Sequence, residues 1–499
     1  MRTKTAISFG LVDVTAKPDS IFIADDKQSF VDMQQLKYDE LEIRKFATLE
    51  KGYFRLDGTF ELFPDDPTEH DFGLWSSSMS EGNGEFVNPV MLTIEFTELH
   101  NSLGLTFTFH EATDDYCTAM NVRWYGTSNS LLSNMDFNPG STVYFADNAV
   151  EGYTKIIITF YSTNKPYRYL KLPQLDFGQI KLFSGRDLIN ANILEEIDPI
   201  SSELRINTLN FTLYSEDAEF SILNPQGIFS RLQQKQPLKV YEYLDGVKKK
   251  MGTYYLDEWE NEDEYNINMS TIDLVGVLDG TNFAGGTYSN VTAGFIINEI
   301  MMSANAEYEF DEGLGSKMLS GLIPVCTHRE ALQQVAFAIG GIVDCSRTHK
   351  IKIYPMPTVL SGHIGKDRKF EGHKLKLKPL VTGVEVTAHN YVNGEDNPRI
   401  FGVYSTSLAP GDKENILKVE EATLVSNSNA LEVAQRVYDY FQMRHQNEGE
   451  ILLQNEECGQ IVTIDSLHNQ KIKGIVEKLD IDLTGGFIAA STITGGLLE

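Results

Sequence analysis

The sequence lacks the features of a secreted or membrane-inserted protein. Its 499 residues include only four cysteines, Cys117, Cys326, Cys345 and Cys458, which are too dispersed for the disulfide framework of a small secreted domain. No apolar run is long enough to span a bilayer. At the N-terminus apolar and polar residues alternate, so the apolar core of a signal peptide is not formed. These absences predict free thiols, synthesis in the cytoplasm and no membrane insertion.

Positive charge is also scarce. The 42 Lys and Arg residues face 71 Asp and Glu residues, and the formal net charge is −29. Electrostatic binding to nucleic acid or to an anionic membrane needs clustered basic groups, so the composition disfavours both. Solubility alone can account for the acidity. If the chain formed a ring, an acidic lumen would also let DNA pass without holding it.

Recognisable catalytic motifs are missing as well. We find no nucleophile elbow, Walker A loop, dinucleotide fingerprint or zincin helix, so we expect no enzyme activity and no cofactor. Cys326, His328, Cys345 and His349 could supply four metal ligands, but their CxH and CxxxH spacings are not standard zinc pairs. His328 also has a natural place in the first turn of a capped helix, so no metal site is predicted.

Acidic residues gather at Asp114-Asp115 and in the run from Asp257 to Glu264. General acid and base catalysis needs two carboxylates in unlike environments at a defined separation, and neighbours on a strand point to opposite faces. Adjacency in the sequence therefore does not indicate such a pair. We interpret the run as a solvated loop after a strand, with a Ca²⁺ site or an acidic ring facing a lumen as the alternatives.

Apolar and polar residues alternate strictly in several places over positions 46–178, which follow an entry segment over residues 1–45. The alternation predicts an antiparallel β-sandwich. Residues 98–102 have the size of a turn between two such stretches, which predicts a hairpin. The inward-facing residues expected from the period are Val90, Leu92, Ile94, Phe96, Leu103, Leu105, Phe107, Phe109, Ile156, Ile158 and Phe160.

Aromatic residues of this region are candidates for sugar binding. Trp75, Trp124 and Tyr125 could present flat faces to sugar rings, and Arg123 could supply hydrogen bonds. The alternative is that they belong to the core of the sandwich.

The remaining chain is predicted to form two β-barrels separated by an α/β domain. Residues 179–275 form the first barrel, in which Leu209, Phe211 and Leu213 alternate with polar residues and Asp245-Gly246 makes a hairpin turn. Residues 276–365 form the α/β domain. Residues 366–499 form the second barrel, where leucines alternate with lysines over 374–378.

Helices are expected at three places in these domains. Residues 290–304 and 429–446 carry apolar residues at helical spacing. A third helix starts at Thr327, which forms a capping box with Glu330, and it ends at Gly340-Gly341. Strands are expected at 342–344, 350–354, 460–464 and 471–483.

Several segments resemble tail proteins of phages and prophages of Gram-positive bacteria. Leu49–Gly58 (LEKGYFRLDG) resembles the opening of modules that look like carbohydrate-binding β-sandwiches, and 73–76, 88–89 and 101–109 continue the likeness. Residues 195–200, Leu204 and Asn224–Gly227 resemble the start of the phage tail hub domain. Together they resemble the baseplate hub, or tail-associated, family of phage tails and tail-like particles.

The resemblance implies a mainly β fold with α/β parts, in which a sandwich precedes a hub of two barrels and a small α/β domain. It also implies a non-enzymatic homotrimer at the tail tip of a virion, made in the host cytoplasm. The ring would adapt a sixfold tail tube to the tip, contact distal tail and spike proteins, and let DNA pass through its lumen without specific binding. The sandwich would contact host cell-wall glycan or pack against neighbouring tail proteins.

Many related proteins continue into a peptidase, lysozyme-like or fibre-like region, and no such region is expected here, so a wall-degrading activity would reside on another subunit. Two other functions remain open at this stage: a host-glycan adhesin or receptor-binding protein, and a glycoside hydrolase.

Overall fold

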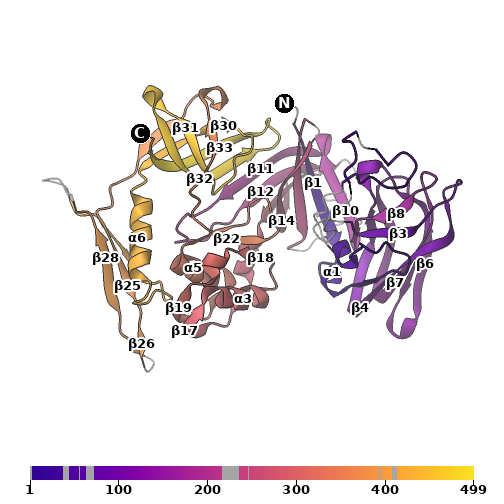
Figure 1. The fold of residues 1–499 in the computed structure, drawn as a ribbon, viewed down its shortest axis with the longest axis horizontal. Coiled ribbons are helices and arrows are strands. Elements are labelled where there is room, and N and C mark those ends of the chain that lie inside the picture. Colours follow the sequence, from indigo (N-terminus) through magenta and orange to yellow (C-terminus); the bar gives the residue numbers. More distant parts are fainter. Residues whose placement is uncertain are drawn as a thin grey trace. The chain divides into compact units, whose positions relative to one another are not determined.

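The structure is a computed structural model that describes residues 3–37, 44–55, 57–62, 72–215, 235–245, 247–392, 395–406 and 413–498. The chain divides into two compact units. We call residues 9–181 the sandwich unit, and residues 1–8 with 182–499 the main unit. Both units are built largely of antiparallel strands, which confirms the predicted mainly β class with α/β parts (Figure 1). No helix in the described ranges has the length and apolarity to cross a membrane.

The sandwich unit contains a six-stranded sheet, in which β9 pairs with β4 beside the order β2-β4-β7-β5-β6, and a two-stranded sheet, β3-β8. A core of buried apolar residues fills the unit. Its elements are α1 (Ala16–Asp19), β2 (Ile21–Ile23), β3 (Leu74–Met79), β4 (Glu85–Thr108), β5 (Cys117–Tyr125), β6 (Leu131–Phe137), β7 (Val143–Thr163), β8 (Tyr169–Leu172) and β9 (Gln174–Asp176). The chain passes between the units within β1 (Thr3–Val12) and β10 (Gly178–Ser184).

The hairpin predicted around residues 98–102 is wrong. Both of its expected arms belong to the single strand β4, which pairs with β7 along its whole length. The register shifts between Glu95 and Gly104, so the polar segment is an irregularity within the strand and does not reverse it. The alternation itself is confirmed, because Val90, Leu92 and Ile94 are fully buried.

The main unit is built on a 13-stranded sheet with the path β10-β1-β13-β14-β15-β12-β11-β32-β33-β30-β24, to which β31 and β23 are added beside β32. Strands expected in two separate barrels are therefore joined in one sheet, through the antiparallel pairing of β11 with β32. The strands not yet given are β11 (Leu188–Glu196), β12 (Thr208–Tyr214), β13 (Pro237–Leu244), β14 (Val247–Asn261), β15 (Asn266–Ile272), β23 (Leu360–Ile364), β24 (Lys374–Leu377), β30 (His445–Leu452), β31 (Ile461–Asp465), β32 (Lys471–Asp482) and β33 (Ile488–Leu497).

The α/β part has the helices that the sequence predicts. In α5 (His328–Ile339), the Glu330 N–H donates to Thr327 Oγ1 and the Thr327 N–H donates to Glu330 Oε2, so the capping box is present. Gly340 ends the helix with φ at 78°, a left-handed conformation that glycine adopts without strain. The other α-helices are α2 (Leu274–Val277), α3 (Ala293–Ala304), α4 (Glu312–Gly315) and α6 (Ala430–Phe441).

Small sheets complete the main unit around one apolar core. They pair as β16-β20, β17-β19, β18-β22-β21, β28-β25-β29 and β26-β27. Their strands are β16 (Asn282–Phe283), β17 (Gly286–Thr292), β18 (Tyr308–Phe310), β19 (Met318–Ile323), β20 (Cys326–Thr327), β21 (Gly341–Asp344), β22 (Ile351–Pro355), β25 (Gly383–Ala388), β26 (Tyr391–Val392), β27 (Glu395–Asp396), β28 (Arg399–Tyr404) and β29 (Ile416–Val419). Short 3-10 helices lie at Met33–Lys37, Glu111–Thr113, Thr127–Asn129, Gly185–Asp187, Leu278–Gly280, Lys366–Arg368 and Leu467–Asn469.

Two segments named from the sequence can be located in the structure. The entry segment contributes β1 to the 13-stranded sheet, and β2 pairs with β4. The acidic run does not follow a strand as a loop: residues 257–261 lie in β14, and the turn to β15 begins only at Glu262. Leu56, Gly246 and Asn224–Gly227 lie outside the described residues.

Candidate functional site

The sequence-predicted sugar-binding residues fall into two groups. Trp75 and Trp124 are 3% and 0% exposed, and both lie in the core of the sandwich unit. The Trp75 ring packs edge-on against Phe72, and the Trp124 ring packs against Phe137. Neither indole presents a face to solvent, so the prediction that these two tryptophans form a stacking platform does not fit the structure.

Arg123 and Tyr125 lie on the other face of β5. They alternate with the buried Val122 and Trp124 and are half-buried, so their side chains reach the solvent-facing side of the sheet. Asn121 shares this face and donates hydrogen bonds of 2.8 Å from its Nδ2 to the side chains of Asn134 and Asp136 on β6. The sheet thus brings an arginine, a tyrosine and amide groups together on an open surface.

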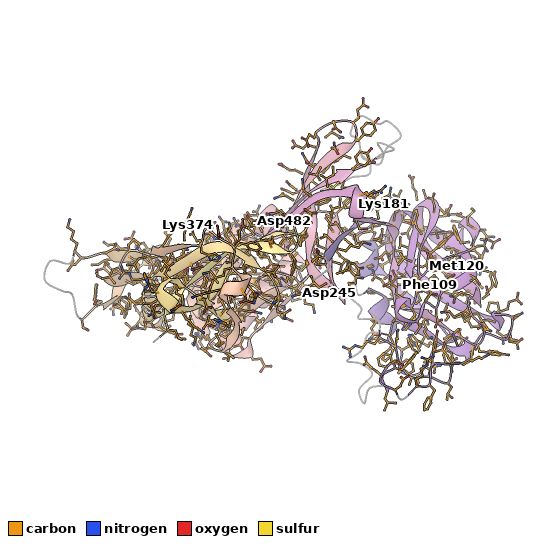
Figure 2. All side chains as sticks on the ribbon, turned by 90° about the horizontal axis from the view of Figure 1, so that it is seen from above. Phe109, Met120, Lys181, Asp245, Lys374 and Asp482 are labelled. Carbon is orange, nitrogen blue, oxygen red and sulfur yellow. The ribbon has the colours of Figure 1, made fainter. Side chains whose placement is uncertain are left out.

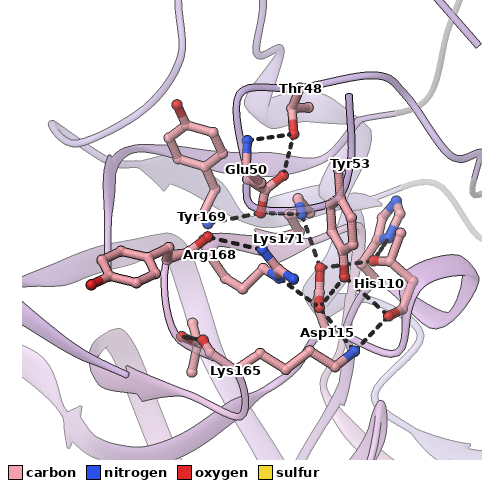
Figure 3. A network of polar contacts seen from close by, with 12 residues as sticks. Thr48, Glu50, Tyr53, His110, Asp115, Lys165, Arg168, Tyr169 and Lys171 are labelled. Carbon is pink, nitrogen blue, oxygen red and sulfur yellow. Dashed lines mark hydrogen bonds and ion pairs between the residues drawn. The ribbon is translucent and has the colours of Figure 1, made fainter. Parts of the chain in front are cut away.

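A network of polar contacts in the sandwich unit surrounds Lys171 on β8 (Figure 3). Its ammonium Nζ lies 2.7 Å from Glu50 Oε1 and 3.1 Å from Asp115 Oδ2. The side chains of Lys171, Glu50 and Asp115 are 1%, 0% and 2% exposed. A charge buried to this degree is tolerated only when it is paired and hydrogen-bonded, and each of these three is.

Glu50 ties the segment before β3 to β8. Its carboxylate accepts hydrogen bonds from the Thr48 hydroxyl at 2.7 Å and from the Tyr169 backbone N–H at 3.1 Å, in addition to the bond from Lys171. Residues 48–53 are thereby fixed to a strand that lies about 120 positions later in the chain. The glutamate of the LEKGYFRLDG segment therefore has a structural role.

Asp115 is the second buried acid of the cluster and contacts its remaining side chains. Tyr53 OH donates to its Oδ1 at 2.8 Å, and Lys165 Nζ lies 3.2 Å and Arg168 Nε 3.5 Å from the same atom. Burial alone would raise the pKa of Asp115, but Lys171 and the hydrogen bonds hold that pKa below its usual value. The Arg168 guanidinium also lies 4.0 Å from the centre of the Tyr53 ring, a cation–π contact.

His110 lies at the edge of the cluster in neutral form. Burial, and then the neighbouring Lys171 charge, lower the pKa of His110 to about 3. Its Nδ1 lies 2.6 Å from the oxygen of the Thr113 hydroxyl, which itself donates to Asp115 Oδ2, and its Nε2 lies 3.0 Å from the Arg44 carbonyl oxygen. Because the acids here are already bonded to cations and hydroxyls, the cluster fixes loops and offers no free acid–base pair.

A second histidine ties α1 to the irregular part of β4. His100 is 3% exposed, and its Nδ1 and Nε2 lie 2.8 Å from Asp13 Oδ2 and 2.9 Å from Asp19 Oδ2. Burial lowers the pKa of His100, but the bonds to Asp19 and Asp13 outweigh this effect and raise that pKa above 6.5. Two carboxylate partners can both accept only from the protonated ring, which donates from both nitrogens.

The main unit buries acids of a different kind. Asp273 caps α2 by accepting from the Gly276 N–H at 3.0 Å, and it also accepts from the Asn207 N–H at 3.1 Å. Burial raises the pKa of Asp273 to about 7, and burial likewise raises the pKa of Asp344 to about 6. Sequence reasoning found neither residue, because a capping aspartate and a strand-end aspartate are ordinary in sequence.

The cysteines and histidines considered as metal ligands do not form a site. The His328 ring nitrogens lie 2.8 Å from Thr281 Oγ1 and 2.6 Å from Ser303 Oγ, while His349 Nε2 lies 3.2 Å from Glu307. All four cysteines are free. Across the part of the chain that the structure describes, no group of three or more His, Cys, Asp or Glu side chains could hold a metal ion.

Known proteins resemble the chain in structure and not in sequence. No family model and no curated protein matches it. The 43 kDa tail protein of prophage MuSo2 from Shewanella oneidensis is similar at TM-score 0.44 and 12% identity, over 63% of this chain and 94% of that chain. The prophage tail protein gp18 from Listeria monocytogenes EGD-e is similar at TM-score 0.43 and 11% identity, over 63% and 91%. The family 32 carbohydrate-binding module of NanJ from C. perfringens, solved with galactose, is similar at TM-score 0.22 and 8% identity, over 34% and 97%.

Proposed function

We propose that the chain is a structural protein of a phage tail or tail-like particle, and that three copies form a ring at the tail tip. The observation that carries the proposal is the order of parts in the main unit. Strands β11 to β15, the α/β part and strands β30 to β33 follow one another in the order that the resemblance to tail hub proteins implies. The pairing of β11 with β32 joins the two β parts in one sheet, as a rigid ring segment requires.

Charge supports the same role. The chain carries a formal net charge of −29, and a ring of several copies would surround its lumen with acidic protein. Such a lumen repels phosphate groups, so DNA would slide through it without binding specifically. The buried charge cluster of the sandwich unit agrees with a structural role, because its acids all bind side chains and backbone groups that hold loops in place.

Electron microscopy of the purified chain and of the assembled particle tests this proposal. We expect discrete threefold rings from the purified chain, and antibody labelling of the particle at the tail tip. If each assembled particle held only a single isolated copy, or if label bound along the whole tail, the proposal would be wrong.

Glycan binding by the sandwich unit is a second candidate function, favoured by the open face of β5. Arg123 and Tyr125 lie side by side there, and Arg123 Nε is buried without a hydrogen-bond partner among the described residues. A sugar hydroxyl could supply that acceptor while the tyrosine ring supports the sugar face.

A glycan array probed with the full chain tests the second candidate. Arg123→Ala should lower binding at least about 10-fold, the loss expected for a buried hydrogen bond to a charged group. Arg186→Ala, which removes an exposed arginine from a 3-10 turn of the main unit, is the matched control and should have no effect. Binding that is equal in both variants, or absent from the wild-type chain, contradicts sugar recognition at this face.

A further inference from the structure

The 13-stranded sheet of the main unit ends in an unpartnered edge at β24. This strand pairs with β30 on one side, and all four of its side chains are exposed. Leu375 is 39% and Leu377 61% exposed, and Phe370 just before the strand is 42% exposed. A strand edge offers unpaired backbone groups, and exposed leucines beside it add apolar surface, so β24 has the properties of a contact surface.

The same segment is basic in an otherwise acidic chain. Residues 366–378 contain six Lys or Arg residues and two acids, although acids outnumber basic residues 71 to 42 in the whole sequence. Lys374 forms no ion pair with any acid in the described ranges, and Lys376, 56% exposed, contacts Glu448 at 2.7 Å. The edge therefore favours an acidic partner.

A complementary surface lies on the β14–β15 hairpin. Residues 257–264 contain six acids and no basic residue. No ion pair within the described part of the chain engages Glu258, Glu260, Glu262 or Glu264. Beside the turn, the rings of Tyr214 and Tyr265 lie 6.2 Å apart and are 40% and 43% exposed. Acids next to exposed tyrosines match lysines next to exposed leucines, because aromatic side chains are enriched in protein interfaces.

These two surfaces belong to opposite regions of one sheet. Six strand-to-strand steps separate β15 from β24, or roughly 29 Å along the sheet at about 4.8 Å a step. Figure 2 shows the hairpin, in pink, projecting well away from Lys374. The two surfaces lie apart within one copy in this view, so they can meet only between copies.

We propose that the β24 edge of one copy docks on the acidic β14–β15 hairpin of a second copy. The contact is head-to-tail, so a pair of copies keeps one free β24 edge and one free hairpin, and repetition gives a closed ring where the rotation allows it. The inference deepens the proposed ring and rests on it for the number of copies, but the contact itself requires only a second chain. It also gives the acidic run a role that solubility alone does not explain.

Charge reversal within the full chain tests this contact. Lys374→Glu with Lys376→Glu places two acids opposite the acidic hairpin and lowers the formal charge of residues 366–378 from +4 to 0, and Glu260→Lys with Glu262→Lys places two lysines opposite the basic edge and changes the charge of residues 257–264 from −6 to −2. Each double variant should weaken self-association at least about 10-fold by sedimentation velocity, because like charges then face each other. The variant with all four changes places opposite charges at the four exchanged positions again and should regain most of the association. Salt at about 1 M should weaken the wild-type contact, since the Debye length falls to about 3 Å.

Each outcome decides the proposal. If the two double variants associate like the wild type while rings persist, the docking surfaces are wrong and the ring is retained. A wild-type chain that stays monomeric up to about 100 µM, with or without reversal, overturns the contact, and the lysines then act as a guard against edge pairing. Loss of association in the fourfold variant, with an unchanged circular dichroism spectrum, also overturns it. The control for net charge is Asp187→Lys with Glu203→Lys, which replaces two exposed acids elsewhere in the main unit. This variant should self-associate like the wild type in sedimentation velocity.

Discussion

Replacing Lys171 by Met should destabilise the sandwich unit by about 3 kcal/mol. The substitution keeps the volume of the side chain but removes the cation that lies between Glu50 and Asp115, whose side chains are 0% and 2% exposed. Removing one partner of a buried ion pair costs about 3–5 kcal/mol, because a buried charge is left uncompensated. We place the effect at the lower end, since Glu50 keeps the Thr48 hydroxyl and the Tyr169 N–H, and Asp115 keeps Tyr53 and two further cations.

Urea unfolding followed by tryptophan fluorescence measures this loss in the full chain. Trp75 and Trp124 belong to the sandwich unit, and the third tryptophan, Trp259, lies in β14. A Trp259→Phe background therefore makes the signal specific to the sandwich unit. For a unit of this size, 3 kcal/mol corresponds to a fall in Tm of roughly 6–12 °C.

Lys155→Met is the matched control. That lysine contacts Glu95 at 3.2 Å in the same unit, but the two side chains are 26% and 47% exposed, so its removal should cost less than about 1 kcal/mol. Adding Glu50→Gln to Lys171→Met should recover at least about 1 kcal/mol, because it removes the uncompensated carboxylate. If Lys171→Met costs no more than Lys155→Met, the buried ion pairs of Lys171 do not stabilise the sandwich unit.

Three further outcomes can be measured by denaturation. Because the pKa of His100 is raised, the protonated ring stabilises the sandwich unit fully below about pH 6.5, and this contribution is lost as the pH rises through the folded-state pKa. His100→Gln should therefore flatten the fall in sandwich-unit stability between pH 6 and 8. The pKa of Asp273 is raised to about 7 because burial favours the protonated acid. The stability of the main unit should therefore fall as the pH rises from about 4 to 8. Asp273→Asn should remove at least about 1 kcal/mol of that fall while keeping the cap of α2. Thr327→Ala breaks the capping box of α5 and should cost the main unit about 1 kcal/mol at any pH in this range.

Local signals in the sequence predicted the elements that local physics determines. The capping box and the glycine that follows α5 define both ends of that helix, and each is present in the structure. Alternation placed the buried residues of β4, β7 and β12 on the correct face, apart from Leu103, which is only half-buried beside a register shift. The hairpin at residues 98–102 was wrong because a polar pentapeptide can form either a turn or a bulge, and the long pairing partner β7 decides between them.

The candidate sites show a similar division. Alternation along β5 was sufficient to put Arg123 and Tyr125 on the face opposite Trp124, and it could also have excluded Trp124 as an exposed platform. The cluster around Lys171 could not be predicted, since Glu50, Asp115 and Lys171 are separated by 56 to 121 positions. Each of these residues, taken alone, has the appearance of an ordinary surface charge.

A buried arginine, Arg347, connects the two β parts of the main unit through ion pairs. Glu195 on β11 is fully buried and holds Arg347, which follows β21, through two bonds of 2.9 and 3.1 Å. Arg347 also lies 3.4 Å from Glu457, just before β31, and the Cys458 thiol donates to the Glu195 carbonyl. One buried arginine thus contacts residues from the first β part and the last, while its own backbone belongs to the α/β part. Separating the first β part from the α/β part would leave the buried Glu195 without its arginine, which helps to explain why segments with distinct sequence patterns form a single compact unit.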